Sequence, residues 1–251
     1  MIRLDDARVV ITGAGGGVGS VLVETFAAAG ARVVACDLPA VRLDHPAIVE
    51  RHAFDICDRV AVAQGAAAIL AGGAPAAVIS NAGWTRAETM ADVTPEALRA
   101  EMDLNFTGAA DFTLALLPGL RGRAEGAALV FIASVNALAH HGNPSYSSAK
   151  AALLAWMRAI AVEEGRHGIR ANAVVPGSIR TPAWDQRLKF DPDVLDRVSR
   201  LYPLGRIVTP AEVANAALFL ASALDSGITG AALAVDAGLS AGNLPFLDAI
   251  T

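Results

Sequence analysis

The sequence of 251 residues predicts an α/β fold: one doubly wound domain in which a mainly parallel sheet of seven strands carries helices on both faces. Two observations predict this class. Short β-branched runs alternate with helical stretches along the chain, and a glycine-rich turn separates the first run from the first helical stretch. A third observation predicts a site on that fold. The chain has only two tyrosines and two lysines, yet Tyr146 precedes Lys150 by four positions.

The first elements form a βαβ unit. Residues 8–12 read as a buried strand, residues 18–29 as a helix that ends at Gly30, and residues 31–36 as the second strand. A unit of this length is ordinary for two parallel strands joined by a crossover helix.

The same alternation continues to residue 235. After a third strand that precedes Asp55, further strands are expected at residues 76–79, 128–132, 171–175 and 231–235. Helices are expected at residues 59–70, 95–116, 145–164 and 210–221, two of which begin with a Thr-Pro pair typical of a capped first turn. The polar segment at about 181–205 departs from the pattern. We expect it to form a small substrate-loop insertion within a single domain of residues 1–251.

Composition and charge argue against several classes of protein. An apolar fraction of 54% excludes disorder, and a net charge of −5 without any basic cluster argues against nucleic-acid and anionic-membrane surfaces. The uncharged stretch 60–80 is rich in alanine and contains glycines and a proline, so we do not expect a membrane span. Cys36 and Cys57 are too few for a disulfide framework or a zinc site. With no visible signal peptide, these features favour a cytoplasmic protein.

The turn at residues 12–19 has the sequence TGAGGGVG. Glycines let the chain turn tightly and let its backbone approach a pyrophosphate, whose charge is met by free N–H groups and the positive helix end. We therefore expect Gly13, Gly16, Gly17 and Val18 to bind a dinucleotide. A flexible turn without a ligand is the alternative, but the position between a strand and a helix favours the nucleotide.

Asp37 ends the second predicted strand, where a carboxylate can accept hydrogen bonds from both hydroxyls of an adenosine ribose. It would also repel a 2′-phosphate, and Leu38 follows it where an NADP site would place an arginine. The sequence therefore favours NAD, although a surface acid at a strand end remains the alternative. Asp55 and Ile56, after the third strand, are candidates for contact with the adenine.

Tyr146 and Lys150 are expected on one face of a helix, within reach of each other. A free phenol has a pKa of about 10, and a nearby ammonium favours the phenolate. The pair would then exchange a proton with a carbinol or carbonyl oxygen. Ser134, at the carboxyl edge of the sheet, could hold that same oxygen. Each residue also has a purely structural interpretation, which becomes less favoured when all three lie beside a dinucleotide site.

Six motifs in this order resemble the short-chain dehydrogenase/reductase family, in its subclass of about this chain's length. The motifs are TGxxxGxG at 12–19, Asn81-Ala82-Gly83, Asn105, Ser134, Tyr146-xxx-Lys150 and Pro176-Gly177. The resemblance spans residue 8 to about residue 240. It implies a Rossmann domain that binds NAD and forms a homodimer or homotetramer.

The resemblance also implies a division of labour. Tyr146 would be the general acid/base, Lys150 would lower its pKa and bind the nicotinamide ribose, Ser134 would position the substrate oxygen, and Asn105 would hold a water of the proton relay. Further cofactor contacts are implied for Asn81, Ala82, Gly83, Pro176, Gly177, Ile179 and Thr181.

Substrate choice should rest with the loop after Ser134 and with the insertion after Thr181. The candidate pocket residues are Trp84, Asn136, His140, His141, Trp184 and Arg187. They suggest a compact, partly polar or hydroxylated ring substrate. Adjacent histidines in a loop rarely share one ion, so no metal site is expected.

The leading hypothesis is therefore an NAD-dependent oxidoreductase that acts on a secondary alcohol or ketone. One alternative is a non-catalytic NAD-binding protein that keeps the fold. Another is a lyase similar to halohydrin dehalogenases, which Lys150 and the intact glycine turn argue against.

Overall fold

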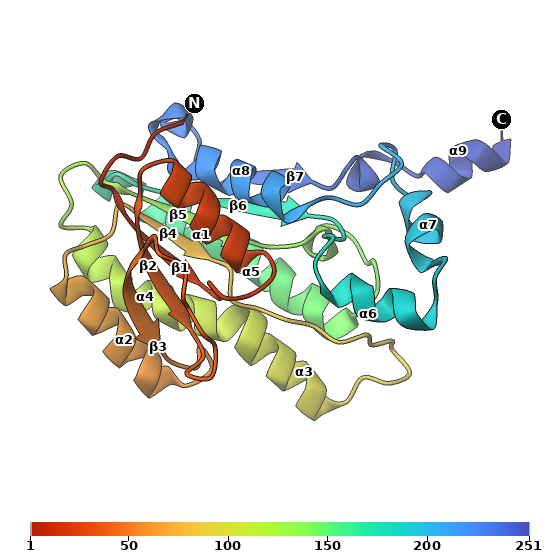
Figure 1. The fold of residues 1–251 in the computed structure, drawn as a ribbon, viewed down its shortest axis with the longest axis horizontal. Coiled ribbons are helices and arrows are strands. Elements are labelled where there is room, and N and C mark those ends of the chain that lie inside the picture. The colour runs from red at the N-terminus through yellow and green to blue at the C-terminus, as the bar shows by residue number, and fades with distance from the viewer. Residues whose placement is uncertain (1, 251) are drawn as a thin grey trace.

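The computed structural model describes residues 2–250 and shows one seven-stranded sheet between two layers of helices (Figure 1). The strand order is β3-β2-β1-β4-β5-β6-β7, and every neighbouring pair is parallel. The predicted doubly wound class is confirmed, with a sheet that is parallel throughout. The strands are β1 (Arg8–Thr12), β2 (Arg32–Asp37), β3 (Ile48–Ala53), β4 (Ala77–Ser80), β5 (Ala127–Ile132), β6 (Ile169–Pro176) and β7 (Ala232–Val235).

The helices follow the strands in the expected alternation. They are α1 (Gly19–Ala28), α2 (Arg59–Ala71), α3 (Pro95–Met102), α4 (Gly108–Leu120), α5 (Pro144–Glu163), α6 (Ala183–Phe190), α7 (Val194–Ser199), α8 (Pro210–Ala221) and α9 (Leu244–Ile250). Short turns of 3₁₀ helix lie at Val135–Ala137, Gly165–His167, Ala223–Asp225 and Leu239–Ala241. Within residues 2–250, none of these helices combines the length and the apolar character needed to cross a membrane.

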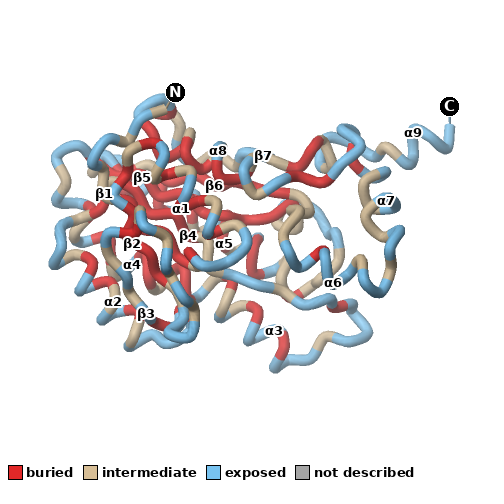
Figure 2. The backbone as a smooth tube through the Cα atoms, in the orientation of Figure 1, coloured by how far each residue is buried: buried red, intermediate tan, exposed pale blue. Residues whose placement is uncertain are grey.

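Two hydrophobic cores lie on opposite faces of the sheet. Val9 and Ile11 of β1 pack with Phe26 of α1 and with α8, whereas Val10 faces the layer of α2, α4 and α5, where Phe112 is buried. Burying each phenylalanine stabilises the fold by about 2–3 kcal/mol. Figure 2 shows the consequence: buried backbone is concentrated in the strands, and α7 and α9 lie outside it.

The structure differs from the predicted elements in two places: one predicted helix is divided into two, and the polar insertion contains two helices. The stretch 95–116, expected as one helix, is divided by a π-helical turn at Asp103–Thr107 between α3 and α4. A π turn inserts one residue into the helical repeat, which hydrophobic periodicity does not reveal, and such turns are frequent at functional sites. The polar segment after residue 181 forms α6 and α7, which extend to one side of the sheet (Figure 1).

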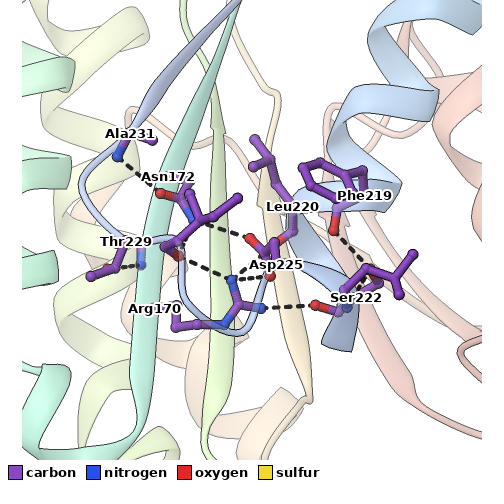
Figure 3. A network of polar contacts seen from close by, with 11 residues as sticks. Arg170, Asn172, Phe219, Leu220, Ser222, Asp225, Thr229 and Ala231 are labelled. Carbon is purple, nitrogen blue, oxygen red and sulfur yellow. Dashed lines mark hydrogen bonds and ion pairs between the residues drawn. The ribbon is translucent and has the colours of Figure 1, made fainter.

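A network of buried polar groups closes the edge where the strands begin (Figure 3). Arg170 of β6 forms an ion pair with Asp225, which lies in the 3₁₀ turn after α8. The side chain of Asp225 is fully buried. Asn172 Nδ2 donates to Asp225 Oδ2 at 3.2 Å. The Arg170 guanidinium also donates to the backbone carbonyls of Leu220, Ser222 and Ile228. These contacts join β6 to the end of α8 and to the loop before β7.

Candidate active site

A cleft of about 770 Å³ opens at the carboxyl edge of the sheet, beside the ends of β1, β2 and β4. The strand order reverses between β1 and β4, and ligands of doubly wound sheets bind at such a switch point. The β1–α1 turn lines one wall. Gly13 has a φ of 64°, and a Cβ built on Gly19 would lie 1.9 Å from the carbonyl oxygen of Gly13. A side chain is therefore disfavoured at Gly13 and excluded at Gly19, where the chain turns into α1.

The cleft fits a dinucleotide. No side chain caps the first turn of α1, and Val18 and Gly19 at this positive helix end line the cleft. Asp37 at the end of β2 is held in place, because its carboxylate accepts from the N–H groups of Gly15 and Leu38, each at 2.8 Å. A carboxylate has about four acceptor positions, so these two bonds leave capacity for ribose hydroxyls. Thr181 lies close to this turn, since a Cβ built on Gly17 would be 3.1 Å from Thr181 Cβ.

Most of the predicted cofactor contacts lie together in this cleft. They are Gly13, Gly16, Gly17, Val18, Asp37, Asp55, Ile56, Asn81, Ala82, Gly83 and Thr181. Asn81 has a structural task as well, since its Nδ2 donates to the carbonyl oxygens of Thr12 and Gly13, both at 3.1 Å. Pro176 and Ile179 line neither this cleft nor the adjoining cavity; they belong to the end of β6 and to the loop after it.

A second cavity of about 320 Å³ adjoins the cleft, and Thr181 lines both. Ser134, Tyr146 and Gly177 lie on its wall. Lys150 is buried behind Tyr146, with its Nζ atom 5.5 Å from the centre of the tyrosine ring. The same Nζ donates to the carbonyl oxygen of Ile132 at 3.1 Å. The structure thus brings the serine, tyrosine and lysine of the sequence motifs to one place.

Burial dominates the titration of this pair. Desolvation lowers the pKa of Lys150 to about 8, and the charge of Glu101 opposes that fall. Desolvation raises the pKa of Tyr146 to about 12, and a hydrogen bond with the Ser134 hydroxyl only partly offsets it. The sequence led us to expect that Lys150 lowers the pKa of Tyr146, whereas burial of the phenol raises that pKa. A further positive charge in the adjoining cleft would favour the phenolate.

Asn105 lies in the π-helical turn and is almost fully buried. Its Nδ2 donates to Trp84 O at 2.9 Å and to Glu101 Oε2 at 2.8 Å. Its Oδ1 has no hydrogen-bond partner among the described residues. A Cβ on Gly83 would lie 2.7 Å from that oxygen and 3.3 Å from Lys150 Nζ, so both atoms border the same small space. A water molecule suits such a polar space.

The candidate substrate residues divide between the two cavities. Asn136, His141, Trp184 and Arg187 line the second cavity. Trp84 lines the cofactor cleft instead, next to Gly83 in the loop after β4. His140 lines neither cavity. Neighbouring residues of an irregular loop point in different directions, so the sequence could not decide which of the two histidines faces inward.

Other residues at the site were not among the sequence candidates. Thr85, Asn143, Ser178 and Leu239 also line the second cavity. Tyr202 lines it too, and it belongs to the segment after Thr181 that we expected to border the pocket. The Tyr202 hydroxyl accepts from Ser178 N at 2.9 Å and so fixes the loop after β6. Glu101, buried four residues before Asn105, is a further one. The available signal was an acid one helical turn before a motif asparagine, on the same helix face.

Known proteins resemble the chain over nearly its whole length. Residues 13–240 match the family described as enoyl-(acyl carrier protein) reductase. An uncharacterized oxidoreductase of Schizosaccharomyces pombe is 38% identical over 94% of this chain and 91% of its own. Galactitol 2-dehydrogenase (L-tagatose-forming) of Cereibacter sphaeroides is 31% identical over 95% and 96%. The crystal structure of a short-chain dehydrogenase/reductase family oxidoreductase from Burkholderia thailandensis has a TM-score of 0.88 and 39% identity, covering 98% of this chain and 97% of that one.

Proposed function

Because the chain belongs to the short-chain dehydrogenase/reductase family and is a dehydrogenase of CH–OH groups, we propose that it uses NAD to interconvert a secondary alcohol and its ketone. The nicotinamide, when bound, supplies or accepts the hydride at the carbinol carbon. The observation that carries the proposal is the placement of Tyr146 and Ser134 on a cavity that adjoins the glycine-lined cleft, with Lys150 buried behind the tyrosine.

Tyr146 is the proposed general acid/base. In oxidation its phenolate takes the hydroxyl proton of the alcohol, and in reduction its phenol returns a proton to the carbonyl oxygen. Ser134 Oγ accepts from Asn136 N at 3.2 Å and makes a long contact of 3.3 Å with Asn136 Oδ1. When the Ser134 hydroxyl gives up that long contact with Asn136, it can donate to the substrate oxygen instead. The Lys150 ammonium retains N–H groups, beyond its bond to Ile132, for the nicotinamide ribose.

The proposed preference for NAD rests on Asp37. Its carboxylate is held at the cleft wall by two backbone N–H groups, and it would face the ribose hydroxyls of the adenosine half. A 2′-phosphate there would meet this negative charge, and the next side chain, Leu38, offers no compensating cation.

The proposed substrate is a compact, hydroxylated molecule such as a polyol, a sugar or a cyclic diol. Asn136, His141, Asn143 and Arg187 surround the cavity with hydrogen-bonding groups, and Trp184 provides an apolar face. The similarity to a galactitol dehydrogenase supports this class.

We also propose a homodimer or homotetramer in a reducing cytoplasm. Leu114 of α4 and Val162 of α5 are exposed apolar residues on two neighbouring outer helices, as an interface between copies would require. Both cysteines are free thiols, as a reducing compartment would maintain. Light scattering coupled to size-exclusion chromatography gives the oligomeric state directly.

The function is tested by following NADH absorbance with a panel of polyols, aldoses and cyclic secondary alcohols. We expect turnover with at least one compact hydroxylated substrate, and a higher kcat/KM with NAD⁺ than with NADP⁺. Turnover with NADP⁺ at equal or greater efficiency would contradict the role given to Asp37. Failure of every alcohol and ketone with both cofactors would contradict the proposed reaction.

A further inference from the structure

We propose that Glu101 is a positioning residue that fixes the side-chain amide of Asn105 and provides the buried negative charge opposite the Lys150 ammonium. This role of Glu101 depends on the proposed function only for its effect on catalysis. The geometry and the charges can be tested on the protein without a substrate.

Glu101 is a buried carboxylate with specific partners. Glu101 lies in the last turn of α3 and is 7% exposed. Oε2 accepts from Asn105 Nδ2 at 2.8 Å, and Oε1 accepts from the Thr85 hydroxyl at 3.3 Å. Burial of a carboxylate costs free energy unless hydrogen bonds or charges compensate it. Glu101 is therefore better explained by what it holds.

The contact with Glu101 decides which way the Asn105 amide points. The Nδ2 group is directed at two acceptors, Glu101 Oε2 and Trp84 O. The other amide atom, Oδ1, is consequently directed into the space that Lys150 Nζ also borders. Reversing the amide would bring Oδ1 against a carboxylate and a carbonyl oxygen, which is repulsive. Glu101 thus keeps a hydrogen-bond acceptor beside the lysine.

The charged and titratable groups around Glu101 come from two segments. Arg86 and Glu88 lie on the loop after β4, and Tyr146 and Lys150 lie on α5. The Arg86 side chain is half exposed and lies 3.8 Å from Glu88, so these two groups largely offset each other. Glu101 acts on the buried pair of α5: its charge raises the pKa of Lys150 and the pKa of Tyr146. It therefore favours the ammonium and the neutral phenol.

This arrangement counters the desolvation of Lys150. Without a negative charge nearby, burial would favour the neutral amine, which cannot stabilise a phenolate. Asn105 Oδ1 and the Glu101 carboxylate together make the surroundings of Nζ suitable for a cation. In the proposed reaction, Glu101 acts through Lys150 and Asn105 and does not contact the substrate.

The composition of the chain makes a direct test possible. The chain contains two lysines and two tyrosines, so NMR of protein labelled at lysine Cε and tyrosine Cζ gives two signals of each kind. Lys189→Arg and Tyr146→Phe assign them. In Glu101→Gln, which keeps the size and an acceptor oxygen, we expect the titration midpoints of both Lys150 and Tyr146 to fall by about one pH unit. Glu96→Gln, an exposed acid on the same helix, should leave both midpoints unchanged.

Unchanged midpoints for Lys150 and Tyr146 in Glu101→Gln would overturn the proposal, whatever the substrate proves to be. A kinetic readout separates positioning from simple stability. Once a substrate is known, the pH profile of kcat for Glu101→Gln should move to lower pH, whereas Glu101→Met should also lower kcat because the Asn105 amide loses its partner. A reduced kcat with an unmoved pH profile in both variants would show a structural role alone and would equally overturn the proposal.

Discussion

Buried charges lie at both edges of the sheet, and the two edges treat them differently. Where the strands begin, Asp225 is fully buried but pairs with Arg170, which also donates to three carbonyl groups (Figure 3). Where the strands end, Lys150 is 4% exposed, has one carbonyl acceptor, and adjoins the unpartnered Oδ1 of Asn105. The first edge pairs its buried acid with a cation of the protein itself. The second edge leaves hydrogen-bonding capacity for groups that the protein does not supply.

The largest expected difference is in stability. Arg170→Met leaves the buried Asp225 without its cation, so we expect the free energy of unfolding to fall by about 3–5 kcal/mol. The exposed Arg32→Met at the same edge is the control and should change it by no more than about 0.5 kcal/mol. Urea denaturation followed by circular dichroism measures both. If Arg170→Met were as stable as Arg32→Met, the contrast between the edges would not hold.

Lys150→Met should act in the opposite direction because it removes a buried cation whose desolvation Glu101 offsets only in part. The pKa of this lysine falls from its ordinary 10.5 to about 8 on burial. As pH rises from 8 to 10, the folded protein loses this proton while the unfolded chain keeps it, so wild-type stability rises. At neutral pH we expect the variant to unfold with a free energy at least equal to that of the wild type. Between pH 8 and 10 the difference should move by about 2 kcal/mol in favour of the wild type.

A pH-independent difference between Lys150→Met and the wild type would show that Lys150 is not desolvated as described. Comparing the two proteins at each pH is necessary because other groups, the buried Cys36 among them, also titrate abnormally and contribute equally to both.

Asp37→Ala tests the cofactor half of the carboxyl edge. Removing a carboxylate that would accept from ribose hydroxyls should raise the KM for NAD⁺ by about tenfold. The KM for NADP⁺ should fall, because the repulsion of its 2′-phosphate is removed. Steady-state kinetics with both cofactors gives the two values. Equal effects on NAD⁺ and NADP⁺ would place Asp37 outside the ribose site.

The smallest expected effect distinguishes two neighbouring histidines. His141 lines the substrate cavity and His140 does not. His141→Ala should raise the substrate KM by about fivefold, the loss of one ordinary hydrogen bond, whereas His140→Ala should leave it unchanged. The reverse result would mean that this loop rearranges when substrate binds.

The sequence predicted the regular parts of the molecule well, because hydrophobic periodicity directly reflects burial. The first strand, Arg8–Thr12, and the last long helix, Pro210–Ala221, have the expected bounds. Asp37 and Thr181 lie in the cleft because motifs at strand ends are placed by the topology of a parallel sheet. Local pattern therefore predicted most of the fold, and the motif positions predicted many of the residues that line the cleft.

What the sequence could not predict depends on tertiary contacts. The π turn that presents Asn105 does not alter the apolar pattern, and Glu101 looks like any acid of a surface helix until α5 covers it. The effect of Lys150 on Tyr146 was judged from spacing alone, whereas desolvation is a property of the whole surrounding fold. The side chains of His140 and His141 lie on an irregular loop, and hydrophobic periodicity does not predict the direction in which each of them points.

The carboxyl edge is proposed to hold a cofactor and to move a proton through Tyr146. The most direct measurement compares Tyr146→Phe with the wild type on the first substrate found, by kcat and by NADH affinity from fluorescence titration. Removing one hydroxyl should lower kcat by about 10²- to 10⁴-fold and leave the dissociation constant of NADH within about twofold. A variant that retained wild-type kcat would contradict the account.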